Sequence, residues 1–141
     1  MDAIRFYMEE NLESVEPDVS VYEAAKKMVA SGVGALLVND RGEWLGIVTH
    51  VDFTRKVIVA DLDPMKTPVS NVMSGPLLTL DGEETMDRAF VTMRQKNVRH
   101  LAVTRNHNVI GMLSMKDFAN YYNHKFASRP PSRKPDDPDE A

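Results

Sequence analysis

The feature that most constrains the fold of this 141-residue chain is an internal duplication with a period of 65 residues. Gly46–Phe53 reads GIVTHVDF and Gly111–Phe118 reads GMLSMKDF, so the glycine, hydroxyl, aspartate and aromatic positions coincide. Residues 8–53 align with residues 73–118 without a gap, and most of the differing pairs are like-for-like exchanges. A repeat of this kind predicts two copies of one folding unit.

The first copy predicts the order strand, helix, strand, strand, helix. Expected are an edge strand at residues 13–16, a helix from residue 21 to a stop at Gly32, strands at 34–38 and 44–48, and a helix capped by Thr49. Ser20 and Glu23 form a predicted capping box before the first helix. The first helix is expected to bury Val21, Ala24, Ala25, Met28 and Val29. The second is expected to bury Phe53, Val57 and Ile58.

The second copy predicts the same order. Expected are a short strand at 77–80, a helix capped by Thr85 and stopped by Asn97, strands at 100–104 and 109–113, and a helix at about 115–124. The domain boundaries follow as repeat 1 at 5–60, an ordered linker at 61–72, repeat 2 at 73–124, and a disordered tail rich in proline and charge at 125–141.

Composition limits the classes of protein that this chain can be. Apolar residues make up 43% and charged residues 27%, as in globular domains, and no apolar run approaches the ~18 residues that span a bilayer. A net charge of −4 argues against a general nucleic-acid surface. The chain has no cysteine and its N-terminus lacks a signal-peptide pattern, so we expect a cytoplasmic protein without disulfides or a membrane anchor.

No sequence pattern indicates catalysis or a metal centre. The four histidines lack the spacing of metal ligands, and the sequence contains neither a phosphate-binding glycine loop nor a nucleophile elbow. We therefore expect no enzyme activity, no metal and no cofactor.

The repeated motif has its own chemistry. Each hydroxyl, Thr49 or Ser114, lies where a strand enters a helix, and helix N-termini attract phosphate. Each aspartate, Asp52 or Asp117, follows one turn later with two acceptor oxygens that suit the vicinal diol of a ribose. The same pairs are also ordinary capping boxes that need no ligand.

The glycine that precedes each hydroxyl also has two interpretations. Gly46 and Gly111 either let a ligand approach the backbone closely or only relieve crowding in the strand. The sequence alone leaves both open.

The tandem order, with each copy closed by Gly-apolar-x-Ser/Thr-x-x-Asp, resembles a pair of CBS domains over roughly residues 5–124. The resemblance implies an α+β fold in which two βαββα repeats pack sheet to sheet, with pseudo-twofold symmetry and two clefts between them. It further implies that the motif aspartate holds ribose hydroxyls, that the Ser/Thr lies near phosphate, and that two such modules pair as a disc-like homodimer.

The two copies differ at the start of their central strand. The second has Arg99 and His100 where the first has Gly34 and Ala35. The resemblance implies that basic residues here reach phosphates, so we expect Arg99 and His100 to support Ser114 and Asp117, although His100 also fits a structural role. The cleft of Thr49 and Asp52 is then expected to take an uncharged adenosyl group, lend its surface to the other site, or stay empty.

These expectations together describe a stand-alone regulatory module. It would bind AMP, ADP, ATP or S-adenosylmethionine and signal by a change of shape or oligomeric state, through homodimerisation or a separate protein target. The alternative is a ligand-free scaffold that serves dimerisation or partner docking.

Overall fold

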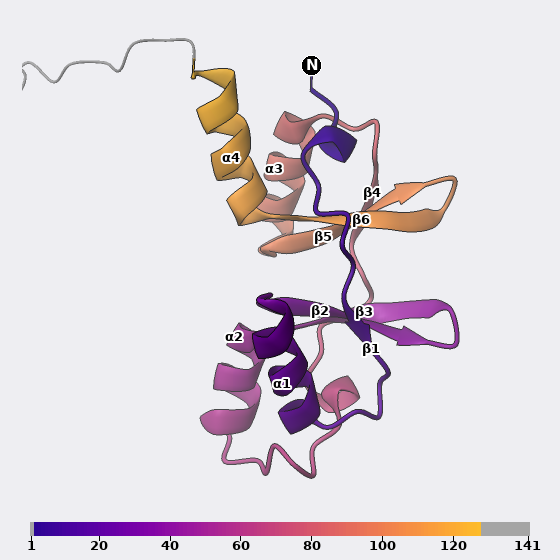
Figure 1. Cartoon of the computed structure of the whole chain (residues 1–141), viewed down its shortest axis with the longest axis vertical. Coiled ribbons are helices and arrows are strands. Elements are labelled where there is room, and N and C mark those ends of the chain that lie inside the picture. Colours follow the sequence, from indigo (N-terminus) through magenta and orange to yellow (C-terminus); the bar gives the residue numbers. More distant parts are fainter. Residues whose placement is uncertain (1, 128–141) are drawn as a thin grey trace, which may run out of the picture.

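The computed structural model describes residues 2–127 and contains two three-stranded sheets with helices on their outer sides (Figure 1). Repeat 1 consists of β1 (Ser14–Val15), α1 (Val21–Ser31), β2 (Ala35–Asp40), β3 (Glu43–Thr49) and α2 (His50–Phe53), which the π-helical turn η2 (Thr54–Ile58) continues. Repeat 2 consists of β4 (Thr79–Asp81), α3 (Met86–Lys96), β5 (His100–Arg105), β6 (Asn108–Ser114) and α4 (Met115–Lys125). The predicted α+β fold of tandem βαββα repeats is confirmed, and residues 128–141 of the predicted tail lie outside the described residues.

The helix ends form largely as the sequence predicts. Gly32 and Asn97 end α1 and α3 in the left-handed conformation, with φ of 67° and 54°. Ser20 Oγ accepts the Glu23 N–H at 3.1 Å, but the Glu23 side chain pairs with Lys26 at 3.6 Å instead of returning to Ser20. Of the predicted capping box, only the hydrogen bond to the Ser20 side chain is therefore present.

Alternation along the central strands divides the apolar side chains between two layers. Leu36 and Val38 of β2 pack into the core that β2 shares with its own helices. Leu37, between them, is fully buried but lies outside that core. Ala102 of β5 is placed in the same way relative to the core of repeat 2. Because the two sheets are adjacent in Figure 1, these intervening side chains face the opposite sheet and hold the repeats together.

Each repeat is completed by the segment that precedes the other repeat. The 3₁₀ turn at Ile4–Phe6 places Ile4 in the core of repeat 2, and the turn at Val69–Asn71 places Val69 in the core of repeat 1. Matching backbone bridges join Ala3 to Thr85, Pro68 to Ser20, Glu9 to Met112, and Ser74 to Ile47. Within the predicted linker at 61–72, Val69 and Val72 belong to the core of repeat 1.

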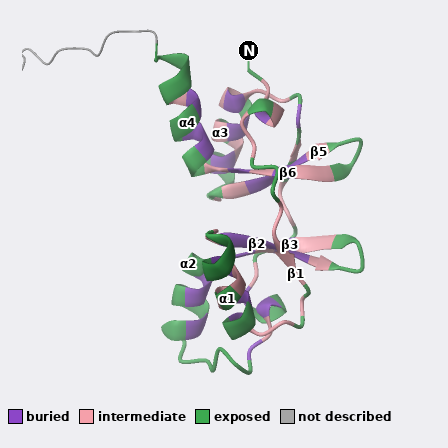
Figure 2. Ribbon diagram, in the orientation of Figure 1, coloured by how far each residue is buried: buried purple, intermediate pink, exposed green. Residues whose placement is uncertain are grey.

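Two residues predicted to be buried are exposed. The exposed fraction is 84% for Val29 and 72% for Ile58, so both predictions are wrong (Figure 2 shows the exposed faces of the helices). Ile58 ends the π-helical turn, in which the Val59 N–H bonds to the Thr54 carbonyl. This wider turn differs from the α-helical spacing on which the prediction depended, and it leaves Val57 buried while Ile58 faces solvent.

The motif glycines are required by the chain crossing between repeats. A Cβ at Gly46 would overlap the backbone carbonyl of Ser74, and a Cβ at Gly111 would overlap the side chain of Met8. Both contacts lie beside the backbone bridges of the crossing segments. The crowding interpretation therefore holds, and the crowding comes from a neighbouring segment rather than from the strand itself.

We expect Gly46→Ala to destabilise the protein more than Gly111→Ala. The carbonyl against Gly46 belongs to a bridged backbone and cannot move aside, whereas the first obstacle at Gly111 is the end of a flexible side chain. Overpacking of a tight core typically costs about 1–3 kcal/mol, and we expect Gly46→Ala in the upper half of that range. Urea unfolding of both variants measures the difference, and equal losses would contradict this account of Gly46.

Candidate functional site

Two clefts lie between the repeats, and each is lined by both. The first, cleft 1, has a volume of about 240 Å³ and contains Thr49, Asp52 and Arg55 from repeat 1 with Arg99 and His100 from repeat 2. The crossing chain adds Ser74, Pro76, Leu77 and Leu78 to the wall of this cleft. Cleft 1 therefore combines the strand end of one repeat with the strand start of the other.

The second, cleft 2, has a volume of about 260 Å³ and occupies the pseudo-symmetric position. Its motif residues are Ser114 and Asp117, with Lys116 between them, and repeat 1 contributes Gly34 and Ala35. The crossing segment adds Glu9 and Asn11, and His100 reaches this cleft as well.

The predicted grouping of the basic residues is wrong for Arg99. Arg99 lines cleft 1 with Thr49 and Asp52, not cleft 2 with Ser114 and Asp117. Because the sheets face each other, the residues that open a central strand contribute to the cleft of the opposite repeat's motif. His100 borders both clefts, so its predicted proximity to Ser114 is confirmed but is not exclusive.

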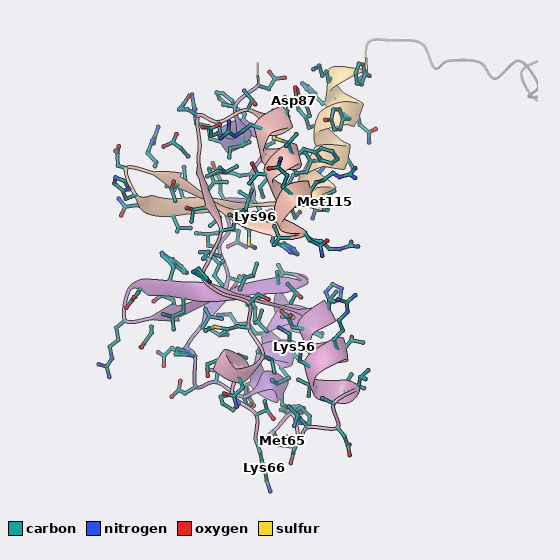
Figure 3. All side chains as sticks on the ribbon, turned by 180° about the vertical axis from the view of Figure 1, so that it is seen from behind. Lys56, Met65, Lys66, Asp87, Lys96 and Met115 are labelled. Atoms are coloured by element: carbon teal, nitrogen blue, oxygen red, sulfur yellow. The ribbon has the colours of Figure 1, made fainter. Side chains whose placement is uncertain are left out.

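Thr49 and Asp52 form a complete capping box. Asp52 Oδ2 accepts the Thr49 N–H at 2.9 Å, and Thr49 Oγ1 accepts the Asp52 N–H at 3.2 Å. Lys56, labelled in Figure 3, lies one helical turn further on, and its Nζ is 3.2 Å from Asp52 Oδ1 and 2.9 Å from the Val72 carbonyl oxygen. The buried carboxylate of Asp52 is thus compensated by a cation and fixed in position.

Asp117 has a less compensated environment. Its Oδ2 accepts the Ser114 N–H at 2.8 Å and the Ser114 hydroxyl at 3.3 Å. No lysine or arginine among residues 2–127 forms an ion pair with it. Burial raises the pKa of Asp117, and the Ser114 hydrogen bonds oppose this only in part.

His100 lies among other basic groups. Burial is the main cause that lowers its pKa, and the neighbouring His50 and Arg99 lower it further, while Asp52 opposes them. The His50 ring in turn lies 3.1 Å from the Gly34 carbonyl oxygen through Nδ1. The lowered pKa favours the neutral form of the His100 imidazole.

Comparison with known proteins agrees with this architecture. The profile of the CBS domain matches residues 3–59 and again residues 69–124. The chain belongs to the CBS-domain family. The matched regions include the N-terminal and crossing segments that complete the opposite repeat.

Relatives of the CBS-domain chain occur in plants and bacteria. It is 36% identical over 105 residues to CBSX3 of Arabidopsis thaliana, a CBS domain-containing protein named as mitochondrial, covering 71% of this chain and 51% of CBSX3. It is 29% identical over 119 residues to YhcV of Bacillus subtilis, covering 84% of each chain. The chain spans about half of the length of CBSX3 and 19% of CBSCBSPB1, a second Arabidopsis relative.

Solved structures show the same fold. A protein with CBS domains from Burkholderia ambifaria superimposes with a TM-score of 0.79 at 28% identity, covering 89% of this chain and 90% of that one. A protein from Pyrococcus horikoshii gives a TM-score of 0.78 at 30% identity, covering 95% and 99%. The predicted sheet-to-sheet pair of repeats is thus the arrangement of a known structural family.

Within residues 2–127, no group of three or more His, Asp or Glu side chains is placed to hold a metal ion. No helix in that range is long and apolar enough to cross a membrane.

Sequence reasoning missed several charged residues that line the clefts or contact their motif aspartates. Arg55 and Lys56 follow Asp52 by one helical turn, so their proximity was available from helical spacing. Glu9 was not predictable in this way, because it reaches cleft 2 through a bridge to Met112 far along the chain.

The raised pKa of Asp117 predicts a pH-dependent contribution to stability. The folded state holds the Asp117 proton more tightly than the unfolded chain does, so this contribution is full at low pH and is lost as pH rises through the folded pKa. Relative to Asp117→Asn, which does not titrate, the wild type should lose unfolding free energy between about pH 4 and pH 7. Urea unfolding at both pH values measures this, and a relative gain by the wild type would contradict it.

Proposed function

We propose that cleft 1 binds an adenosine-containing ligand that carries phosphate, and that binding regulates the protein's association or a partner protein. The single observation that carries this proposal is the convergence of Thr49 and Asp52 from repeat 1 with Arg99 from repeat 2 in one cleft. A guanidinium grips phosphate oxygens through two donors, and a fixed carboxylate accepts hydrogen bonds from a diol. Both chemistries are therefore available within one cavity.

The charges of the two clefts favour cleft 1 for an anion. Arg55 and Arg99 line it, and the carboxylate of Asp52 is already paired with Lys56. Cleft 2 contains one lysine, Lys116, against two carboxyl groups, Glu9 and Asp117. A phosphate entering cleft 2 would meet the carboxylate of Glu9 without an arginine to offset it. We propose that cleft 2 takes an uncharged group or stays empty.

Regulation follows from a site that both repeats build. A ligand that contacts both Asp52 and Arg99 favours the arrangement of the two repeats in which both side chains can reach it at once. The ligand can shift the equilibrium toward that arrangement only by as much as it binds that arrangement more tightly than the alternative one. The output is proposed to pass to a separate protein or to a second copy of the chain, in the cytoplasm.

The second candidate is a ligand-free scaffold. The capping boxes of both motifs favour it, because each hydroxyl and aspartate already has a structural partner. The arginines favour the ligand-binding function, because neither Arg55 nor Arg99 forms an ion pair with another residue of the range 2–127.

We expect AMP, ADP or ATP to raise the melting temperature, because a ligand at 100 times its Kd adds about 2.7 kcal/mol to the free energy of unfolding. Arg99→Ala should abolish most of that shift, whereas Arg105→Ala, at the exposed far end of the β5 strand that Arg99 precedes, should retain it. Thermal melting at millimolar ligand, with S-adenosylmethionine included, provides the measurement. If none of the four ligands shifts the wild type, the scaffold function is the correct one.

A further inference from the structure

Cleft 1 contains two guanidinium groups that have no carboxylate partner within residues 2–127. Arg55 comes from the helical turn after Asp52, and Arg99 precedes β5 of the other repeat. Both are exposed, and the ion pairs of the described residues include neither of them. The carboxylate of Asp52 in the same cleft is already paired with Lys56. Cleft 1 therefore keeps two positive charges that are available to an anion.

The same chain carries an anion of matching charge in residues Asp136–Glu140, which we call the acidic segment. It reads DDPDE, with four carboxyl groups and no basic residue. Residues 1–127 carry a net charge of −3, so their surface as a whole repels this segment. Cleft 2 repels it as well, because Glu9 and Asp117 line that cleft. Arginines bind carboxylates through paired hydrogen bonds, so the acidic segment fits cleft 1.

The chain is long enough for the acidic segment to reach cleft 1. α4 begins beside Arg99, because the Met115 N–H donates to the Arg99 carbonyl oxygen at 3.3 Å. Figure 1 shows α4 leading away from the sheets, and its 11 residues cover about 16 Å. Asp136 follows Ala127 by nine residues, which span roughly 28 Å in a proline-rich extended chain. A chain that turns back at the end of α4 therefore passes the start of this helix with about 10 Å to spare.

The surface along this return path is basic. Apart from Asp87 in its first turn, α3 carries only positive charges, and Figure 3 labels Asp87 and Lys96 at its two ends. Arg88, Arg94 and Lys96 are exposed, and none of them forms an ion pair in the part of the chain that the structure describes. These side chains attract carboxylates along α3 toward its sheet end, which Arg99 of cleft 1 follows by three residues.

We propose that the acidic segment docks on Arg55 and Arg99 in cleft 1 and competes there with a phosphate-bearing ligand. The contact is autoinhibitory, because the segment occupies the two arginines until a ligand displaces it. A group tethered by a short linker acts at an effective concentration in the millimolar range, so a weak contact is enough to occupy the site. The competition rests on the proposed function of cleft 1, whereas the docking itself requires no nucleotide.

Disulfide trapping tests the docking without a nucleotide, because the chain contains no cysteine. In the full chain, Pro138→Cys places a thiol inside the acidic segment without removing a carboxylate, and Ser74→Cys places another at an exposed position of cleft 1. Mild oxidation at low salt should convert most of this double variant to a disulfide within one chain. Salt at 1 M should suppress the product, because the Debye length is then only about 3 Å.

The control pair for this trapping combines Pro138→Cys with Asn11→Cys, which lies at an exposed position of cleft 2. We expect this pair to give little disulfide within a chain, since the carboxyl groups of cleft 2 repel the acidic segment. Equal yields from the two pairs, no disulfide within a chain from the Ser74→Cys pair, or a yield that salt leaves unchanged would each overturn the proposal.

Calorimetric titration with AMP measures the competition. Replacing all four acidic side chains of the segment with amides, Asp136→Asn through Glu140→Gln, should lower the Kd for AMP roughly 2- to 10-fold at low salt. The control Arg133→Gln with Lys134→Gln changes the charge just before the acidic segment, and it should leave the Kd without such a decrease. An unchanged Kd after removal of the four carboxyl groups would overturn the proposal. If AMP does not bind the wild type, the proposed function fails, and the disulfide yields still decide the docking.

Discussion

The packing of the two sheets against each other is the interaction on which the rest of the structure depends. Each central strand sends alternate side chains into its own helical core and toward the opposite sheet, where small and medium residues such as Ala35, Leu37 and Ala102 are buried. This close approach brings the start of β5 to the motif of repeat 1, and the start of β2 to the motif of repeat 2. The clefts are therefore consequences of the interface and do not exist in a single repeat.

The two repeats share one backbone arrangement, but their side chains differ in chemistry. The backbone bridges, capping boxes and crossing segments occur in matched pairs. Arg99 stands where the other half has Gly34, although the strands around both positions are alike. Since the fold tolerates either residue at this place, the difference points to function rather than stability. It is the basis on which we propose the phosphate-binding site at the motif of repeat 1.

Much of the fold could be predicted from the sequence, because strand alternation, caps and stop residues are local signals. The features that could not be predicted from the sequence also have physical causes. The exposure of Ile58 depended on a π-helical turn that no residue pattern indicated. The position of Arg99 in the same cleft as Asp52 depended on how the two sheets face each other. The role of Gly46 depended on Ser74, which the predicted boundaries assign to the start of repeat 2 and which the structure bridges to β3 of repeat 1.

We propose that Arg99 of repeat 2 and Asp52 of repeat 1 belong to one nucleotide-binding site, in which Arg99 binds the phosphate and Asp52 the ribose. Calorimetric titration of wild type and Arg99→Ala with AMP and with adenosine tests it most directly, since the two ligands differ only in the phosphate. Loss of a charged hydrogen bond costs about 1.5–3 kcal/mol, so the Kd for AMP should rise roughly 10- to 100-fold while that for adenosine changes little. An unchanged Kd for AMP in Arg99→Ala, with a large rise in Asp117→Asn, would place the phosphate in the other cleft and contradict the claim.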